Sequence, residues 1–413
     1  MRLLGIPFSS TACDYFRVAK PLQTIGERGL AHVEFVPEIQ VPGGEPIRRV
    51  RVGEVSPEQR LEIIESFGYG RLREAEEFIK NYYYHGPDAA TFDVAVFTRR
   101  FETEAVKLIN TLKARGVTVV YDIDDDAFSV PRMNPAYAAW GTDGAQVLKW
   151  YEWLNKPIPF QPHTPQAARA HNKKMLDGLI ECCRAADAIT VTTEPLRQVY
   201  SKFNKNTFVI PNQMAFRDWA YVRPLEHEGE QWFGWAGSRT HFEDLVPLQD
   251  AVLEVLRLVP NSYFIVLGFP EILDHMPKVP RDRCRVFDFM DIFAYRNILA
   301  GIEVVWAPSA PNRFNAGKSD IRVLEAWMCP APVVASETTY GPTVRECGGG
   351  FVAKSPKDWV RHTVRLLTDS ELHAEMAGKG ATYTLNNRTY ETQAHLWLEV
   401  YEKVRGQTLK RAA

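Results

Sequence analysis

The residues best suited to chemistry lie in one stretch, from Asn312 to Ala326. Gly317 lets the backbone approach a ligand closely, and Ser319 is a residue type that caps helix N-termini. Free N–H groups in a first helical turn bind phosphate, and Lys318 adds positive charge at the same end. The stretch therefore predicts a phosphate site at the start of a helix.

Glu325 extends this candidate site along the helix. It follows Lys318 by about two helical turns, so we expect it on the same face, roughly 10 Å along the axis. The spacing suits a nucleoside diphosphate whose ribose hydroxyls contact the carboxylate. The alternative is an ordinary surface helix in which Arg322 and Glu325 form a solvated ion pair.

A second group of polar residues follows a strand predicted at residues 231–236. Gly237 and Ser238 form a loop whose backbone can approach a ligand. Arg239 and His241 come next, and both are candidates for contacting a diphosphate. For His241, the alternative is a histidine at a helix start that hydrogen-bonds only its own loop.

Four aspartates follow a strand predicted at residues 117–121: Asp122, Asp124, Asp125 and Asp126. Carboxylates on alternate residues offer oxygen ligands to a divalent cation. They also suit contact with a hydroxyl acceptor or the role of a base, and the structural alternative is a turn whose charges favour the next helix. Because the stretch around Lys318 already supplies positive charge, we predict no metal site. Asp124 and Asp125 are assigned to the acceptor or to base catalysis.

Alternating strands and helices must hold these groups. Apolar runs at 92–97 and 117–121 flank a helix with apolar side chains at helical spacing, and Gly116 is placed to end it. Such a unit implies parallel strands joined by a right-handed crossover. Further strands are predicted at 3–8, 188–192, 207–210, 231–236, 263–267, 303–306 and 333–335, and further helices at 175–186, 242–259, 318–328 and throughout 356–406.

The alternation predicts two Rossmann-like, doubly wound α/β domains. We expect an N-terminal domain at 1–212, a linker at 213–230, a C-terminal domain at 231–385, and a final helix and tail at 386–413. The Trp- and Pro-rich segment 140–166 is expected to be an irregular insertion over the first domain. Ligands of such folds bind at the carboxyl ends of the strands, so the domains are predicted to face each other across a cleft.

Composition excludes several classes of protein. The 413 residues are 45% hydrophobic and 24% charged, which is typical of a soluble globular protein rather than a disordered one. A formal net charge of -2 gives no overall field that would attract nucleic acid. The six cysteines form no CxxC pair, which favours free thiols in a reducing compartment. No apolar run is as long as a membrane span or a signal sequence, so we predict a cytoplasmic protein.

The motifs resemble those of a known family. The run from Gly317 to Ala326, followed by Pro332 to Ser336, resembles the donor-binding segment of family-4-like GT-B glycosyltransferases (glycosyl transferases group 1), including phage and bacterial members. Three further stretches occur in the family's order: Tyr121 to Asp126 resembles an acidic motif of some members, Val209 to Asn212 the turn ending the first domain, and Gly234 to Ser238, with His241 and Asp244, the glycine loop of the donor domain.

The resemblance implies a GT-B fold and a hexosyl- or related transferase. Such an enzyme moves a sugar from a UDP-, GDP- or other nucleotide sugar to a hydroxyl group, with retention at the anomeric carbon. The C-terminal domain would bind this donor, and the N-terminal domain the acceptor: a glycan, a small molecule or a modified DNA base. Gly237, Ser238 and His241 would help to bind the donor, and Lys318 and Arg239 would stabilise the leaving group. No cofactor, metal ion or integral membrane association is implied.

One departure from the family pattern affects the sugar site. The family has two glutamates separated by seven residues; Glu325 matches the second, but Gly317 stands in place of the first. Recognition of the sugar must therefore differ. Two alternatives stay open: a GT-B-fold sugar-nucleotide epimerase or phosphorylase, and a non-catalytic protein that binds a nucleotide sugar.

Overall fold

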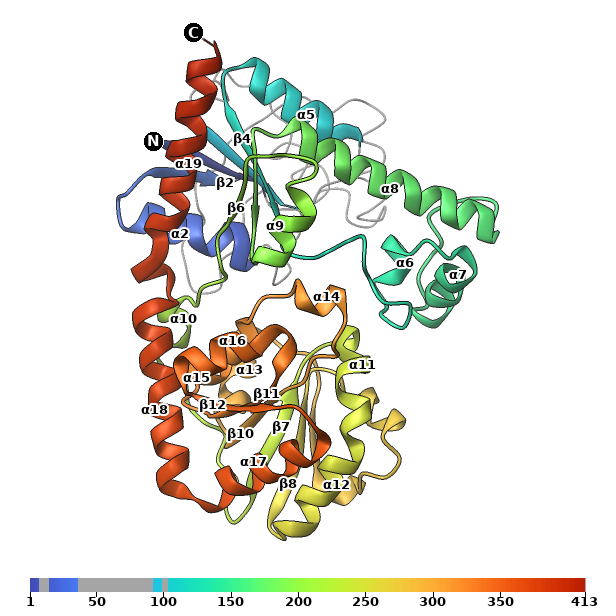
Figure 1. Cartoon of the computed structure of the whole chain (residues 1–413), viewed down its shortest axis with the longest axis vertical. Coiled ribbons are helices and arrows are strands. Elements are labelled where there is room, and N and C mark those ends of the chain that lie inside the picture. The colour runs from blue at the N-terminus through green and yellow to red at the C-terminus, as the bar shows by residue number, and fades with distance from the viewer. Residues whose placement is uncertain (7–14, 36–91, 99–102, 413) are drawn as a thin grey trace, which may run out of the picture. The chain divides into compact units, whose positions relative to one another are not determined.

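The computed structural model describes residues 1–6, 15–35, 92–98 and 103–412 (Figure 1). Contacts divide the chain into two compact units. Unit 1 comprises Met1–Asp124, Met175–Pro211 and Ala394–Ala413, and unit 2 comprises Asp125–Lys174 and Asn212–Gln393.

Unit 1 is built on a parallel sheet with the strand order β2-β1-β3-β4-β5-β6. Strands β3, β4 and β5 are buried along their whole length, as expected where helices cover both faces of a parallel sheet. The strands are β1 (Arg2–Ile6), β2 (His32–Phe35), β3 (Val94–Thr98), β4 (Thr118–Ile123), β5 (Ala188–Val191) and β6 (Thr207–Val209). The helices include η1 (Tyr15–Ala19), α2 (Lys20–Glu27), α5 (Thr103–Ala114) and α9 (Glu194–Tyr200), with parts of α8 (Pro165–Ala185) and α19 (Tyr390–Ala412).

Unit 2 is built on a second parallel sheet, with the order β12-β11-β10-β7-β8-β9. The first strand in the sequence, β7, lies between β8 and β10, so the chain reverses direction across the sheet at the β7–β10 pair. This reversal is the point at which doubly wound sheets bind ligands. The strands are β7 (Gln231–Ala236), β8 (Ser262–Leu267), β9 (Cys284–Phe287), β10 (Val304–Ala307), β11 (Val333–Ser336) and β12 (Gly350–Ala353).

Helices cover both faces of the second sheet. On one face α12 (Gln249–Leu258) and α17 (Pro356–Thr368) lie side by side over Phe233 and Trp306 (Figure 1). On the other face, α13 (Ile292–Leu299) contacts β8, and α15 (Ile321–Met328) contacts β10 and β11. The remaining helices of unit 2 include α6 (Tyr137–Trp140), α7 (Gly144–Trp153), α10 (Phe216–Trp219), η4 (Arg239–His241), α11 (Phe242–Leu245), η5 (Val246–Leu248), η6 (Pro270–His275), η7 (Arg281–Arg283), α13 (Ile292–Leu299), α14 (Arg313–Ala316), α15 (Ile321–Met328), α16 (Glu337–Cys347) and α18 (Ser370–Asn387).

Most predicted elements are confirmed, and three predicted helices have different bounds. The helix expected at 175–186 begins at Pro165, and the segment 140–166, expected to be irregular, contains α7. The helix expected at 242–259 is divided into α11, η5 and α12, with Pro247 at the break, because proline cannot donate the backbone bond that would continue a helix. The helix expected from Lys318 begins only at Ile321 and is preceded by the separate short helix α14. Strands β2, β9 and β12 were not predicted, and none of them is buried along its whole length.

The units differ from the expected domains in two segments. Residues 125–174, which contain the predicted insertion, belong to unit 2, where the Asn134 side chain donates to the Thr240 carbonyl (2.9 Å). The tail from Ala394 belongs to unit 1, where Arg405 pairs with Asp93 (2.6 Å). Within the described residues, no helix has both the length and the apolar character needed to span a bilayer.

Candidate active site

Two loops meet where the second sheet reverses direction, one after β7 and one after β10. Gly237 ends the first strand, and a Cβ atom there would lie 2.4 Å from the Trp235 ring and 3.1 Å from Arg322 Nη2. Gly268, after β8, has φ +102°, and a Cβ on it would lie 2.8 Å from the Gly237 carbonyl oxygen. Only glycine fits this close packing, so the two residues bring the loop after β8 against the loop after β7.

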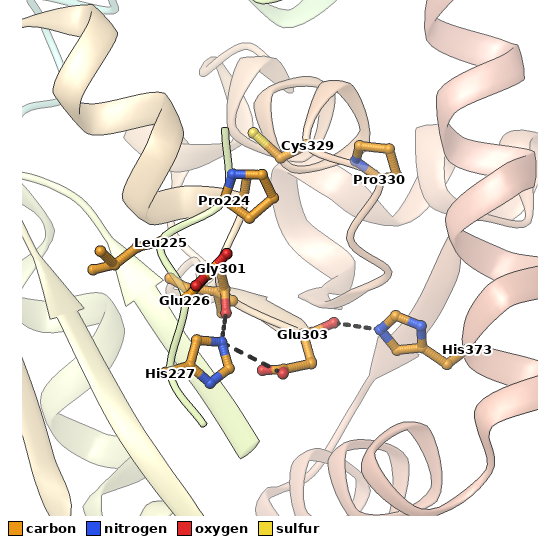
Figure 2. A pocket seen from close by; sticks show the side chains of 11 residues that line it. Pro224, Leu225, Glu226, His227, Gly301, Glu303, Cys329, Pro330 and His373 are labelled. Carbon is orange, nitrogen blue, oxygen red and sulfur yellow. Dashed lines mark hydrogen bonds and ion pairs between the residues drawn. The ribbon is translucent and has the colours of Figure 1, made fainter. Parts of the chain in front are cut away.

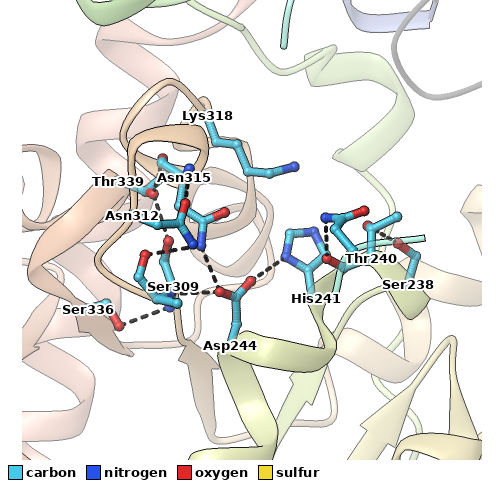
Figure 3. Close-up of polar contacts among 12 residues, drawn as sticks. Ser238, Thr240, His241, Asp244, Ser309, Asn312, Asn315, Lys318, Ser336 and Thr339 are labelled. Atoms are coloured by element: carbon cyan, nitrogen blue, oxygen red, sulfur yellow. Dashed lines mark hydrogen bonds and ion pairs between the residues drawn. The ribbon is translucent and has the colours of Figure 1, made fainter. Parts of the chain in front are cut away.

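Asp244, on α11, joins these loops through its carboxylate (Figure 3). Oδ1 accepts hydrogen bonds from the backbone N–H of Ala310 (2.7 Å) and from the Asn315 amide (2.8 Å). Oδ2 lies 2.8 Å from His241 Nδ1. These bonds outweigh the effect of burial, which alone would raise the pKa of Asp244, and hold that pKa below its usual value. Asp244 is therefore an ionised acceptor that fixes three segments.

His241 is held as a neutral imidazole. Burial, aided by the positive charges of Arg322 and Lys318, lowers the pKa of His241 to about 4, although Asp244 opposes the shift. At neutral pH the Nδ1–H group of His241 therefore donates a hydrogen bond to Asp244. The other ring nitrogen, Nε2, has no hydrogen-bond partner among the residues that the structure describes.

Polar side chains hold the loop after β10 against the loop after β11 (Figure 3). Asn312 caps α14 by accepting from the Asn315 N–H (2.8 Å), and Thr339 Oγ1 donates to the Asn315 carbonyl (2.6 Å). Thr339 has φ +72°, a conformation that costs a β-branched residue energy, and it interrupts α16. The strain lies beside Ser309, whose hydroxyl is 2.9 Å from Thr339 Oγ1.

Lys318 lies in the turn between α14 and α15 and not in a helix. Its Nζ atom is 3.7 Å from Asp125 Oδ1 and 4.6 Å from the centre of the Phe314 ring. The structure thus pairs a residue predicted to act on the donor with one predicted to act on the acceptor. Gly317 is the C-cap of α14, with an ordinary helical φ of −81°.

The other aspartates of the acidic run belong to different units. Asp122 is buried in unit 1, where Arg17 donates to both carboxylate oxygens (3.0 and 2.8 Å), and burial raises its pKa. Asp126 accepts from Ser129 Oγ (2.7 Å) and from Arg313 Nε (3.1 Å) in unit 2. Asp124 is half-buried in unit 1. Among the described residues, no group of three or more His, Cys, Asp or Glu side chains is placed to hold a metal ion.

Glu325 and Arg322 lie one turn apart on α15. Tyr295 donates to Glu325 Oε2 (3.1 Å), and burial raises the pKa of Glu325 to about 7 against the opposing charge of Arg322. Both side chains are half-buried, so they do not form the solvated surface pair that was the alternative. Arg322 Nη1 is buried with no hydrogen-bond partner within the described part of the chain. Its guanidinium carbon lies 5.8 Å from the centre of the Trp235 ring.

Sequence reasoning missed Arg322 as a site residue. It acts electrostatically on His241, Asp244 and Glu325, so its charge lies at the centre of the predicted donor site. The available signal was its position one helical turn before Glu325, which places both on one face. The same spacing also fits a solvated ion pair, and the sequence analysis named Arg322 only in that alternative.

Three other predicted residues have different surroundings from those expected. Ser319 does not cap α15; it accepts from the Asn212 amide (2.9 Å), and the N-cap is Asp320. Arg239 is exposed, with its guanidinium carbon 6.0 Å from the centre of the Phe269 ring. Ser238 is also exposed and shares a hydrogen bond with Thr240 (2.8 Å).

A cavity of about 320 Å³ lies at the amino end of β10, the end opposite to the candidate site. Figure 2 shows the residues that line it. Glu303, just before β10, contributes one wall, and a His373 ring nitrogen lies 2.9 Å from its backbone oxygen. His227 lies 3.6 Å from the Glu303 carboxylate and 2.7 Å from the Gly301 carbonyl oxygen. Because ligands of doubly wound sheets bind at the carboxyl ends of the strands, this cavity is separate from the candidate active site.

The chain was compared with family models, with curated proteins and with solved structures. No family model matches the chain, and no curated protein matches it. Solved structures do match the chain. Sucrose-phosphate synthase from Thermosynechococcus elongatus matches at 13% identity and a TM-score of 0.56, and the match covers 98% of this chain and 100% of that chain. WaaG, a glycosyltransferase involved in lipopolysaccharide biosynthesis, matches at 15% identity and a TM-score of 0.54, covering 98% of each chain. TarM matches at 14% identity and a TM-score of 0.52. The match covers 75% of this chain and about half (54%) of TarM.

Proposed function

We propose that this chain, which has the GT-B fold, is a glycosyltransferase whose nucleotide-sugar donor binds in unit 2. One observation carries the proposal. A buried guanidinium nitrogen of Arg322, with no partner among the described residues, lies at the point where the sheet reverses direction, in the field of His241 and Asp244. A buried guanidinium nitrogen without a hydrogen-bond partner is costly, and an anionic ligand that accepts from it removes that cost. A diphosphate is such an anion.

The diphosphate contacts follow from the positive groups of the site. Arg322 offers planar donors that match phosphate oxygens, and Lys318 offers a point charge from the adjoining turn. When the bond from the sugar to the β-phosphate oxygen breaks, its electron pair stays on that oxygen. Arg322 and Lys318 then stabilise the charge that develops there. Asp125 holds Lys318 near this position in the absence of a ligand.

The nucleoside contact is assigned to Glu325. A carboxylate accepts hydrogen bonds from two ribose hydroxyls, and burial makes such a bond specific. Tyr295 already donates to Oε2 and so fixes the orientation of the side chain. HepE from Anabaena, which matches this chain at 12% identity and a TM-score of 0.55, was solved in complex with UDP. UDP sugars are therefore the first donors to test.

The acceptor is proposed to be a hydroxyl group on a glycan, a small molecule or a modified DNA base, with the anomeric configuration retained. The reaction is also proposed to need no metal ion. Asp124 remains a candidate for the acceptor, and Asp125 for positioning Lys318.

Thermal unfolding with a panel of UDP, GDP and dTDP sugars tests donor binding, because a ligand that binds only the folded state raises its melting temperature. We expect one nucleotide class to raise it, and the matching nucleoside monophosphate to do so less. Nucleotide release with and without candidate acceptors then tests transfer. Binding without release, or conversion of the sugar with the nucleotide still attached, would contradict the proposed transfer.

A further inference from the structure

We infer that His241 takes up a proton on Nε2 when the donor binds. The new Nε2–H group then donates a hydrogen bond to an oxygen of the diphosphate. This inference rests on the proposed function and adds a linkage between donor binding and protons. The imidazolium would form a charged hydrogen bond to the group that departs with the electron pair of the broken sugar–oxygen bond.

The orientation of His241 is set before any ligand binds. Asp244 Oδ2 holds Nδ1 at 2.8 Å, and Asp244 is itself fixed by the Ala310 N–H and the Asn315 amide. The ring therefore carries its proton on Nδ1, and Nε2 is the nitrogen left to bind a ligand. A carboxylate behind a histidine in this way also stabilises the imidazolium once it forms.

The charges that act on His241 from the surrounding elements explain the proton uptake. Asp244 on α11 favours the imidazolium, whereas Arg322 on α15 and Lys318 in the preceding turn oppose it. Without a ligand, burial and the two cations prevail, and the ring is neutral. A diphosphate placed between these groups cancels the field of the cations and adds negative charge beside Nε2. Each of these changes favours the imidazolium.

A neutral His241 would bind a diphosphate less well than a protonated one. Nε2 without a proton presents a lone pair to phosphate oxygens, which are themselves acceptors at neutral pH. Binding therefore either leaves Nε2 facing an anion without a hydrogen bond or draws in a proton. Proton uptake removes this conflict and supplies a third positive group to the diphosphate.

The test measures the affinity for UDP-glucose, or for GDP-mannose if the thermal screen selects guanine, by calorimetry at pH 5.5 and 7.5. A nucleotide sugar is used because its diphosphate is esterified at both ends and does not titrate in this range. We expect that His241→Gln loses affinity at pH 5.5, by threefold or more relative to wild type, and little at pH 7.5. In wild type, the measured enthalpy should change with the ionisation enthalpy of the buffer.

Two comparisons isolate His241 from other titrating groups. Glu325 titrates in the same range with the opposite sign, since its ionised form should bind the ribose, so the difference between wild type and His241→Gln is the quantity to interpret. His275→Gln changes an exposed histidine of the same unit and should behave as wild type. If His241→Gln and wild type have parallel pH profiles and equal buffer dependence, the inference is wrong. If no nucleotide sugar binds at either pH, the proposed function fails first and this inference with it.

Discussion

At the scale of single residues, Arg322 decides whether unit 2 is a donor site. Replacing it by Gln should lower nucleotide-sugar affinity roughly tenfold to hundredfold, because a hydrogen bond between charged groups contributes about 1.5–3 kcal/mol. The melting temperature of the free protein should hardly fall, since Nη1 has no partner to lose within the described residues.

Calorimetry measures the nucleotide-sugar affinity of Arg322→Gln, with Arg257→Gln as the control variant. Arg257 is an exposed arginine of the same unit, paired with Glu254 (2.7 Å). An Arg322 variant that binds as well as the Arg257 variant would place the diphosphate elsewhere.

Glu325 predicts how stability depends on pH. Burial raises its pKa from 4.5 to about 7, so between these values the folded state binds more protons than the unfolded state. Stability contributed by this group is present at low pH and falls as pH rises through that window. Glu325→Gln should therefore raise the free energy of unfolding at pH 8, by no more than about 3.4 kcal/mol, and leave it nearly unchanged at pH 4.5.

Differential scanning calorimetry at the two pH values measures the effect. Glu254→Gln serves as a control, because Arg257 lowers the pKa of that exposed carboxyl. A stabilisation of the Glu325 variant that is equal at pH 4.5 and pH 8 would show that titration is not its cause.

At the scale of elements, an ion pair ties the start of α15 to the end of α18. Asp320 receives two hydrogen bonds of 2.7 Å from Arg388, and Thr343 donates a third (2.7 Å). The arginine and these bonds lower the pKa of Asp320 in spite of its burial. Arg388 also donates to the Asn212 carbonyl (2.9 Å), so one guanidinium joins three segments.

Asp320→Ala should reduce the free energy of unfolding by about 3–5 kcal/mol, because it leaves the buried Arg388 charge without its carboxylate. Urea titration followed by circular dichroism measures the loss. Asp250→Ala, which breaks an exposed pair with Lys278 (2.8 Å), should cost less than about 1 kcal/mol. Equal losses in the two variants would mean that the Asp320 pair is no stronger than a surface pair.

Elements were more predictable than the contacts at their ends. Strand β7 was predicted residue for residue from its apolar run, and Gly116, with φ +80°, ends its helix as expected. The start of α15 was misplaced because Ser319 and Asp320 are both good caps locally, and tertiary contacts with Asn212 and Arg388 decide between them. Likewise Arg322 could not be distinguished from a solvated arginine, since its burial depends on Trp235, which lies far away in the sequence.

At the scale of the whole molecule, the proposed reaction should continue in the presence of EDTA. Arg322, Lys318 and a protonated His241 supply the positive charge that a divalent cation supplies at other diphosphate sites. Transfer rates should agree within about twofold with EDTA and with added Mg²⁺ or Mn²⁺. Loss of activity in EDTA that either metal restores would assign the acidic run to metal binding and disprove the metal-free scheme.

The division of the chain into units also sets an order of assembly during synthesis. Unit 1 contains the earliest residues, yet its core includes Trp397 and Tyr401, which are almost fully buried. The Trp397 ring lies 5.9 Å from the guanidinium of Arg17, the partner of Asp122. A ribosome that has released residues up to 393 has supplied all of unit 2 but not the last segment of unit 1. The half of the protein that is translated first is therefore completed last, and until then its core lacks Trp397 and Tyr401.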